Sequence, residues 1–560
     1  MNAAASQRRM RRLSPQLTTK LLCAAVCTTM ASGCATDPRT GQPSFQQTYA
    51  SQDPCSNNAR NIGIAVGAIA GAILGNQVKH SNGARVIGAL AGATVGGLIG
   101  RDMDQRRCEL SKIAKQYDLN LKTSTISADG AVIDDSRLNA SSNAEAIKKN
   151  AVGMTVELRE QFGKGGHFET NSDQLTEQAQ RYFSAIADSY NARLIANNIS
   201  DPQEKTSYIA QVSQRKILLI GHTDDTGSSR LNADLSERRA QAVAAYMEKR
   251  GIPKESLYFQ GAGEAYPIAD NDSETGRAQN RRVEIVEIAG AANFDRYLAE
   301  RKPRYEFYRG SATPPATQVA AATPAAAPAI KPAPAKVAPA KAAPATAGKT
   351  PEAAVAPVVV AATTISDGID FGGTPLSTVA AVDIGQLNSK SGGTFRLISN
   401  AYADEPPIMS DCSRDRPRVT HGVKALADGK SYRISEYLPG LYGKTWTEQV
   451  NGHQIVLNKL TVLASNGAAA NPPEFKVYTN YNATRNANPT AALAVSPEVN
   501  TYFGNKGLLY RMFFNGKGGL SCADVVFGSD GGTAAKGGRL IYARGARLMS
   551  ADFKPTLYQK

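Results

Sequence analysis

The sequence contains few of the residue types and spacings that support catalysis, metal binding or one large core. Of its 560 residues only 7% are aromatic, and Trp446 is the single tryptophan. None of the seven cysteines forms a Cys-x-x-Cys pair and no His-Glu-x-x-His segment is present, so the common zinc and dithiol motifs are excluded. The segment 519–523, Gly-Leu-Ser-Cys-Ala, lacks the last glycine of a nucleophile elbow, and Gly261-x-Gly263 lacks the third glycine of a dinucleotide loop. We therefore expect a non-enzymatic protein without metal or cofactor, with an unrecognised hydrolase in the C-terminal part as the alternative.

The length and the charge of the chain further narrow the class of protein to which it can belong. The chain is too long for one hydrophobic core, and its 49 glycines and 28 prolines indicate globular domains separated by low-complexity stretches. The formal net charge is +15, but five of these charges precede the first apolar run, so a mature chain would carry about +10. This balance suits an anionic wall polymer or a membrane surface. Nucleic acid would fit the charge alone equally well, but we expect no nucleic-acid partner.

Residues 1–33 have the pattern of a secretion signal. A basic segment is followed by an apolar stretch from Leu21 to Ala31, which is too short to span a bilayer, and then by Ser32, Gly33 and Cys34. This ending resembles the lipobox of bacterial lipoproteins, which implies lipidation of Cys34, although that family prefers leucine where Ala31 stands. The alternative is ordinary cleavage with Cys34 unmodified. Because Ala35 rather than aspartate follows the cysteine, the resemblance favours the outer membrane, with the protein facing the periplasm.

The remaining cysteines fit an oxidising compartment. Once the signal is removed and Cys34 is lipidated, four cysteines remain, an even number. The simplest pairing joins cysteines that are neighbours in the sequence, because each such pair lies at the two ends of one apparent structural unit. We therefore expect Cys55 to bond Cys108 and Cys412 to bond Cys522.

Two apolar stretches, residues 62–78 and 84–100, carry glycine at every fourth position. A glycine costs about 1 kcal/mol relative to alanine in a helix, so this spacing needs a compensating gain. Close approach of two helix backbones supplies it. The pattern resembles a glycine-zipper helical hairpin over residues 61–101, which would enter the membrane and favour self-association. A soluble or interfacial hairpin is the alternative.

The rest of the chain divides by composition. We expect a tether over 34–60, a connector over 102–156, a globular domain over 157–290, an Ala/Pro-rich linker over 291–365 and a mainly β domain over 366–560. Strand-like runs in the last domain, separated by Gly, Asn and Pro clusters, predict a sandwich or barrel of unknown partner. These runs are residues 394–398, 454–463, 475–481, 508–514, 523–527 and 539–543.

The central domain alternates helical and strand patterns, which predicts an α/β sandwich with helices covering a sheet. The expected helices are residues 174–190 and 236–250, and the expected strands are residues 216–220, 257–260 and 282–288.

Two charged residues of this domain stand where open α/β sheets bind ligands. Asp224 follows the strand 216–220, and Arg239 lies in the next helix, for which Ser236 is the expected N-cap residue. Arg239 shares the apolar stripe of Val243, so it needs an anionic partner. On the residues alone, that partner is either a ligand or Asp224 itself in an internal ion pair.

Five ordered motifs make the domain similar to the OmpA C-terminal-like peptidoglycan-binding family, over less than a quarter of the chain. They are Phe168-x-x-Asn171-Ser172, Gly221-His222-Thr223-Asp224-x-Thr226-Gly227, Asn232-x-x-Leu235-Ser236-x-x-Arg239-Ala240, Gly261-x-Gly263-Glu264-x-x-Pro267 and Gly276-Arg277-Ala278-x-Asn280-Arg281-Arg282-Val283-Glu284.

The resemblance implies a binding site for the diaminopimelate of a peptidoglycan stem peptide. Asp224 would receive its ammonium and Arg239 its carboxylate, with Asn232 and Thr223 supporting the pocket. Arg277, Arg281 and Arg282 are expected to be framework or wall-facing charges. The stretch 189–211 is longer than the family usually has, which predicts an extended helix or an insertion.

Together these features predict a non-catalytic anchor that links a membrane to the cell wall, with lipid and hairpin in the membrane and the central domain on peptidoglycan. The alternative is a wall-clamping subunit of a larger trans-envelope secretion or pilus machine.

Overall fold

The computed structural model of the chain describes two folded regions. The described residues are 102–103, 105–135, 151–301, 303–304, 307–308, 311–312, 368–376, 382, 384, 408–409, 411–432, 437–464, 467–482, 489–528 and 532–559. The signal, Cys34, Cys55, the glycine-rich hairpin, most of the Ala/Pro-rich linker and the strand expected at 394–398 lie outside them. Within the described residues, no helix is both long enough and apolar enough to cross a membrane.

The first region contains a seven-stranded sheet in the order β10-β5-β4-β6-β3-β1-β2, in which only β4 and β5 are parallel neighbours. Its strands are β1 (Asn120–Ser127), β2 (Val132–Asp134), β3 (Ala151–Arg159), β4 (Arg215–Gly221), β5 (Leu257–Gly261), β6 (Arg282–Ala289) and β10 (Lys424–Ala425).

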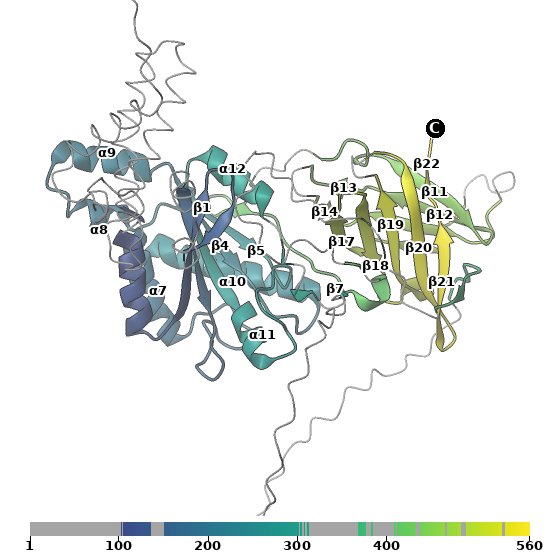
Figure 1. Cartoon of the computed structure of the whole chain (residues 1–560), viewed down its shortest axis with the longest axis horizontal. Helices are drawn as coiled ribbons and strands as arrows, with labels where there is room; N and C mark the ends of the chain where they lie inside the picture. Colours follow the sequence, from purple (N-terminus) through teal and green to yellow (C-terminus); the bar gives the residue numbers. More distant parts are fainter. Residues whose placement is uncertain are drawn as a thin grey trace, which may run out of the picture.

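Helices cover both faces of this sheet, as the alternation of side chains along β4 requires. Ile217 and Leu219 pack under the helix at 105–116, α7 (Glu177–Tyr190) and α10 (Ser229–Lys249), whereas Leu218 and Ile220 pack under α12 (Ala291–Glu300). The predicted α/β sandwich is confirmed, and Figure 1 shows its helices around the sheet.

Two predicted domain boundaries are wrong. The expected connector at 102–156 contributes β1, β2 and β3 to the sheet, and the expected linker at 291–365 begins with α12, which buries Phe294 and Tyr297. The apolar pattern of β1 is weak because its buried positions include Ser124 and Thr125, whose polarity is tolerated through hydrogen bonds such as that from Arg107 to the Thr125 hydroxyl. The domain therefore extends from residue 102 to about residue 300.

The predicted helices and strands of the central domain are present with shifted ends. The long stretch at 189–211 is an insertion of two short helices, α8 (Ala192–Ala196) and α9 (Pro202–Val212), after α7 ends. Ser236 is not an N-cap: α10 begins two turns earlier, where the Ser228 hydroxyl accepts the Leu231 N–H. Ser236 is buried inside the helix and its hydroxyl accepts the N–H of Gly263 at 2.9 Å.

The second region is a β sandwich, which resolves the predicted choice between sandwich and barrel. One sheet has the order β16-β15-β12-β11-β22 and the other the order β17-β18-β19-β20-β21-β8. Its strands are β8 (Thr374–Pro375), β11 (Thr445–Val450), β12 (His453–Asn458), β15 (Glu474–Tyr478), β16 (Leu493–Val495), β17 (Glu498–Phe503), β18 (Leu508–Phe513), β19 (Leu520–Phe527), β20 (Ala535–Arg544), β21 (Arg547–Phe553) and β22 (Thr556–Leu557).

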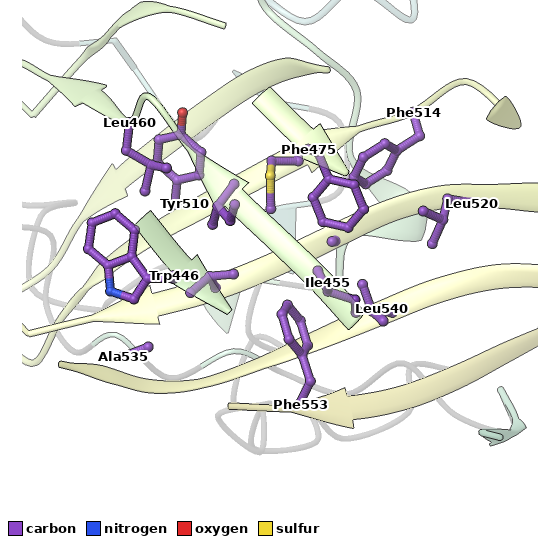
Figure 2. Packing of buried hydrophobic residues seen from close by; sticks show 14 of the residues in the cluster. Trp446, Ile455, Leu460, Phe475, Tyr510, Phe514, Leu520, Ala535, Leu540 and Phe553 are labelled. Carbon is purple, nitrogen blue, oxygen red and sulfur yellow. The ribbon is translucent and has the colours of Figure 1, made fainter. Parts of the chain in front are cut away.

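The two sheets of the sandwich share one core. Figure 2 shows Trp446, Ile455 and Phe475 of the first sheet beside Tyr510, Leu540 and Phe553 of the second. In β12 the inward residues Ile455 and Leu457 are buried and alternate with less buried ones, whereas every residue of β18 is buried. Five of the six expected strand runs coincide with strands.

The cysteines agree with the predicted local pairing where they are described. Cys412 is bonded to Cys522, 110 residues later in the chain. Cys108 is also disulfide-bonded. Its predicted partner, Cys55, lies outside the described residues, so that pairing remains a prediction.

Candidate functional site

The candidate site lies at the carboxyl end of β4, where the loop 222–228 leads into α10. Glycines permit this arrangement: a Cβ at Gly221 would lie 2.1 Å from the Ser236 carbonyl oxygen, and a Cβ at Gly261 would lie 2.4 Å from that of Ala233. Any larger residue would push α10 off the ends of the two parallel strands. The motif glycines therefore fix the position of the helix that carries Arg239 relative to the loop that carries Asp224.

Arg281 forms ion pairs with three carboxylates, one of which is that of Asp224. Its guanidinium lies 2.7 Å from the Asp224 carboxylate, 2.7 Å from that of Glu160 after β3, and 2.8 Å from that of Glu274. Glu274 is the first residue of α11 (Glu274–Asn280). The second oxygen of Asp224 accepts the backbone N–H of Thr226 at 3.0 Å. Asp224 is thus fixed by its neighbours, with 9% of its surface exposed.

Arg239 has no comparable partner. It is 9% exposed, its Nε donates to the Ser172 carbonyl at 2.9 Å, and its guanidinium carbon lies 4.9 Å from the centre of the Phe168 ring. It makes no ion pair with any residue that the structure describes, so the internal Asp224–Arg239 pair considered from the sequence is replaced by Asp224–Arg281. A largely buried guanidinium without a counter-ion among the described residues is a candidate for anion binding.

Asp224 lies close enough to Arg239 to influence its pKa, although the two side chains do not form an ion pair. Burial lowers the pKa of Arg239, while Glu160 and Asp224 act in the opposite direction. The site therefore offers a fixed carboxylate and a free guanidinium within one cluster, an arrangement suited to a ligand that carries both an ammonium and a carboxylate.

Asn232 holds the backbone of the loop. Its Nδ2 donates to the carbonyls of Thr226 at 3.1 Å and Asp224 at 3.3 Å, and to the Glu264 carboxylate at 2.6 Å. Thr223 donates its backbone N–H to the Gly263 carbonyl at 3.0 Å. Its buried hydroxyl has no hydrogen-bond partner among the described residues. The structure thus brings together all four residues of the predicted pocket. Among them, Asn232 supports the backbone of the loop.

His222, beside Thr223, is part of the framework. Burial lowers its pKa to about 3, with Arg282 acting in the same direction, and its Nε2 lies 3.1 Å from the Glu284 carboxylate. Arg282 pairs with the same carboxylate at 2.6 Å. As expected, Arg282 is a framework charge rather than part of the pocket.

Arg281 is the site residue that sequence reasoning undervalued. Three arginines within six positions gave no basis for choosing one, because the choice depends on which of them faces the loop after β4. The sequence offered one signal for the role of Arg281: the residue directly precedes β6, the strand that is hydrogen-bonded to β4. Neither pattern nor charge shows that Arg281, rather than Arg239, pairs with Asp224.

The described residues of this region provide charged groups for a ligand rather than a cluster of metal ligands. No group of three or more His, Cys, Asp or Glu in this part of the chain is arranged to hold a metal ion. The site is a cluster of charged side chains at the carboxyl ends of two parallel strands of the α/β sandwich.

Comparison with known proteins identifies this domain. Residues 167–281 match the model of the OmpA family, and residues 62–107 match that of a glycine zipper. The chain therefore carries an OmpA family domain, in agreement with the resemblance in its motifs.

Curated relatives match a part of this chain. The chain is 48% identical over 75 residues to Outer membrane protein A of Bordetella avium, 13% of this chain and 38% of that protein. It is 45% identical over 71 residues to Outer-membrane lipoprotein YfiB of Pseudomonas aeruginosa, 13% of this chain and 42% of that protein. It is also 45% identical over 71 residues to Peptidoglycan-binding protein ArfA of Mycobacterium tuberculosis, 13% of this chain and 22% of that protein. In each case the chain spans less than half of the relative's length.

Proposed function

We propose that this protein is a non-catalytic envelope anchor whose central domain binds the diaminopimelate of peptidoglycan stem peptides. The observation that carries the proposal is the buried, ion-pair-free guanidinium of Arg239 in the same cluster as the fixed carboxylate of Asp224. A zwitterionic amino-acid end supplies the missing anion and an ammonium for the acid. The name of ArfA as a peptidoglycan-binding protein supports this ligand class.

The ligand enters a site that is already organised. Arg281 and the Thr226 N–H hold Asp224, and the Phe168 ring and the Ser172 carbonyl hold Arg239, so little side-chain order is lost on binding. The ligand ammonium shares the Asp224 carboxylate with Arg281, while the ligand carboxylate takes the free guanidinium nitrogens of Arg239. This division of roles explains why the pocket needs two arginines for one ligand.

The membrane end of the anchor is proposed from the sequence. Lipidation of Cys34 and insertion of the hairpin 61–101 would hold the chain in the outer membrane, facing the periplasm. The names of YfiB and of Outer membrane protein A support an envelope location. The sandwich at 366–560 would then present a surface to a partner that its sequence does not identify, as in a larger envelope machine.

Sedimentation of the mature full-length chain with purified sacculi tests the proposal, together with titration by a soluble diaminopimelate-containing tripeptide. Arg239→Ala should weaken binding at least tenfold, because a charge-assisted hydrogen bond contributes about 1.5–3 kcal/mol. Its matched control is Arg238→Ala, which removes the same charge from an exposed neighbour. The melting temperature should stay near the wild-type value in both, because the fold does not use Arg239 in an ion pair.

Equal binding by Arg239→Ala and Arg238→Ala would show that Arg239 is not the anion-binding group. Failure of the wild-type chain to bind either sacculi or tripeptide would rule out the proposed function.

A further inference from the structure

A segment of the C-terminal half, residues 411–432, leaves the β sandwich and lies on the OmpA family domain. We call it the docking segment. At its start it is fixed to the sandwich by the Cys412–Cys522 bond and by Asp415, whose carboxylate lies 2.9 Å from Arg511 and 2.6 Å from the Tyr502 hydroxyl. The Asp415 side chain is only 4% exposed, so this start is a buried, firmly held point.

The middle and end of the docking segment belong to the other domain. Its strand β10 pairs with the edge strand β5, and Val423 enters the core under the sheet. The His421 N–H donates to the Gly261 carbonyl at 2.8 Å, and Lys424 lies 2.7 Å from the Glu237 carboxylate of α10. Backbone pairing, core burial and charge contacts together make this a specific interface.

Arg416 of the docking segment reaches the loop that carries Asp224. Its guanidinium donates to the carbonyls of Asp225 at 2.7 Å and Gly227 at 2.9 Å, and lies 2.8 Å from the Glu264 carboxylate. The other oxygen of Glu264 accepts from Asn232. Arg416 and Asn232 therefore bond the carbonyls of four successive loop residues, 224–227, and meet at Glu264.

Part of this loop is exposed to solvent. Residues 226–228 are exposed, and Gly227 has a φ of +91°, a conformation open mainly to glycine. Asn232 donates to the first and third of the four carbonyls, and Arg416 donates to the second and fourth. Loss of Arg416 would remove two of these four hydrogen bonds and the ion pair with the Glu264 carboxylate.

We infer that Arg416 is a positioning residue for the wall-binding pocket, so that the C-terminal half of the chain sets the affinity of the OmpA family domain. The inference rests on the proposed function. Arg416 donates to loop carbonyls and lies 2.8 Å from the Glu264 carboxylate and 3.6 Å from that of Asp225. Among the described residues it forms no hydrogen bond or ion pair with the side chains of Asp224, Arg239 or Arg281. It therefore supports the pocket and does not occupy the ligand site.

The test measures tripeptide affinity in the full-length chain together with hydrogen exchange of the peptide that spans residues 222–231. Arg416→Ala should bind three- to tenfold more weakly and exchange faster in this peptide, with β4 and β6 unchanged. Arg414→Ala is the matched control, because it removes the same charge from an exposed position of the docking segment. It should bind within twofold of wild type.

Arg416→Lys keeps a cation beside Glu264 but cannot make both carbonyl bonds, so its affinity should fall between those of wild type and Arg416→Ala. Wild-type affinity and exchange in both Arg416 variants would overturn the inference while leaving the proposed function intact. Faster exchange throughout the domain would also overturn it, by showing a general folding role. Absence of binding by the wild-type chain would instead reject the proposed function.

Discussion

The Asp224 carboxylate lies 2.7 Å from the guanidinium of Arg281, which also bonds Glu160 and Glu274. One arginine thus organises acids from three separate segments of the domain: the loop after β4, the end of β3 and the start of α11. The side chains of Asp224 and Glu160 are 13% and 11% exposed, so each needs this cation to offset its desolvation.

Replacing Arg281 should therefore damage both stability and binding. We expect Arg281→Ala to lower the free energy of unfolding by about 1–3 kcal/mol, because two largely buried carboxylates lose their counter-ion. Tripeptide affinity should also fall, because Asp224 is no longer held. Chemical denaturation and titration measure the two effects.

Arg277→Ala is the matched control for this prediction. Among the described residues, the ion-pair partner of Arg277 is Glu274, which is 40% exposed, and Arg277 also donates to the Asn271 carbonyl at 2.9 Å. Its loss leaves no buried carboxylate without a cation, so it should cost about 1 kcal/mol or less. Equal destabilisation by the two substitutions would mean that Arg281 has no special role in the cluster.

The Cys412–Cys522 bond should account for a large part of the stability of the sandwich. It closes a loop of 110 residues, for which the chain-entropy model gives about 4–5 kcal/mol. The double variant Cys412→Ser/Cys522→Ser should unfold at a clearly lower denaturant concentration. Trp446 is a built-in probe of this transition, because it is the only tryptophan and is fully buried in the core of the sandwich.

The corresponding control is Cys55→Ser/Cys108→Ser, which should leave the Trp446 transition unchanged because the predicted Cys55–Cys108 bond lies outside the sandwich. Similar midpoints for wild type and the Cys412/Cys522 variant would contradict the prediction.

The sequence was most informative where the apolar pattern and the motif residues agree. The run 216–220 predicts a buried strand and the motif that follows places Asp224 after its end, and the structure has both. The bracketing of one unit by Cys412 and Cys522 likewise sufficed to predict their bond. These features depend on local sequence or on a simple pairing rule.

Features that depend on contacts between distant segments could not be predicted. The strand β1 has buried hydroxyl side chains that resemble a polar connector until their hydrogen-bond partners are known. The role of Arg281 could not be predicted either, because its partners Glu160 and Asp224 are 121 and 57 residues away in the sequence. Arg416 likewise contacts Glu264, which precedes it by more than 150 residues. No periodicity within one segment reveals such pairs.

Lipidation is a prediction that the described residues do not test, and Cys34 gives it a direct measurement. Metabolic labelling with a palmitate analogue should mark the wild-type protein, and Cys34→Ser should abolish the label because the thiol is the only acceptor of the diacylglycerol. Cys23→Ser, within the signal, is the matched control and should keep the label. Labelling that persists in Cys34→Ser would refute a lipid anchor at this residue.

The burial of Glu264 should make the stability of the chain depend on pH, and Arg416 should reduce that dependence. Burial raises the pKa of Glu264 from an ordinary value of 4.5 to about 7, with Asp225 acting in the same direction, whereas Arg416, Asn232 and Arg418 oppose the rise. A carboxyl with a raised pKa binds its proton more tightly in the folded state than in the unfolded state. Its ionisation therefore reduces the free energy of unfolding as the pH rises from about 4.5 to about 7.

Removal of Arg416 takes away a cation that favours the charged form, so the pKa of Glu264 should rise further and the loss of stability should continue above pH 7. The difference in melting temperature between wild type and Arg416→Ala should thus be small at pH 5.5, where Glu264 is protonated in both, and larger at pH 8.5. Thermal unfolding at the two pH values measures this difference.

In a Glu264→Gln background the same substitution should have an equal effect at both pH values, because no carboxylate is left to ionise. A difference that is independent of pH in the wild-type background would show that Arg416 acts through the loop carbonyls alone and that its charge does not stabilise the Glu264 carboxylate.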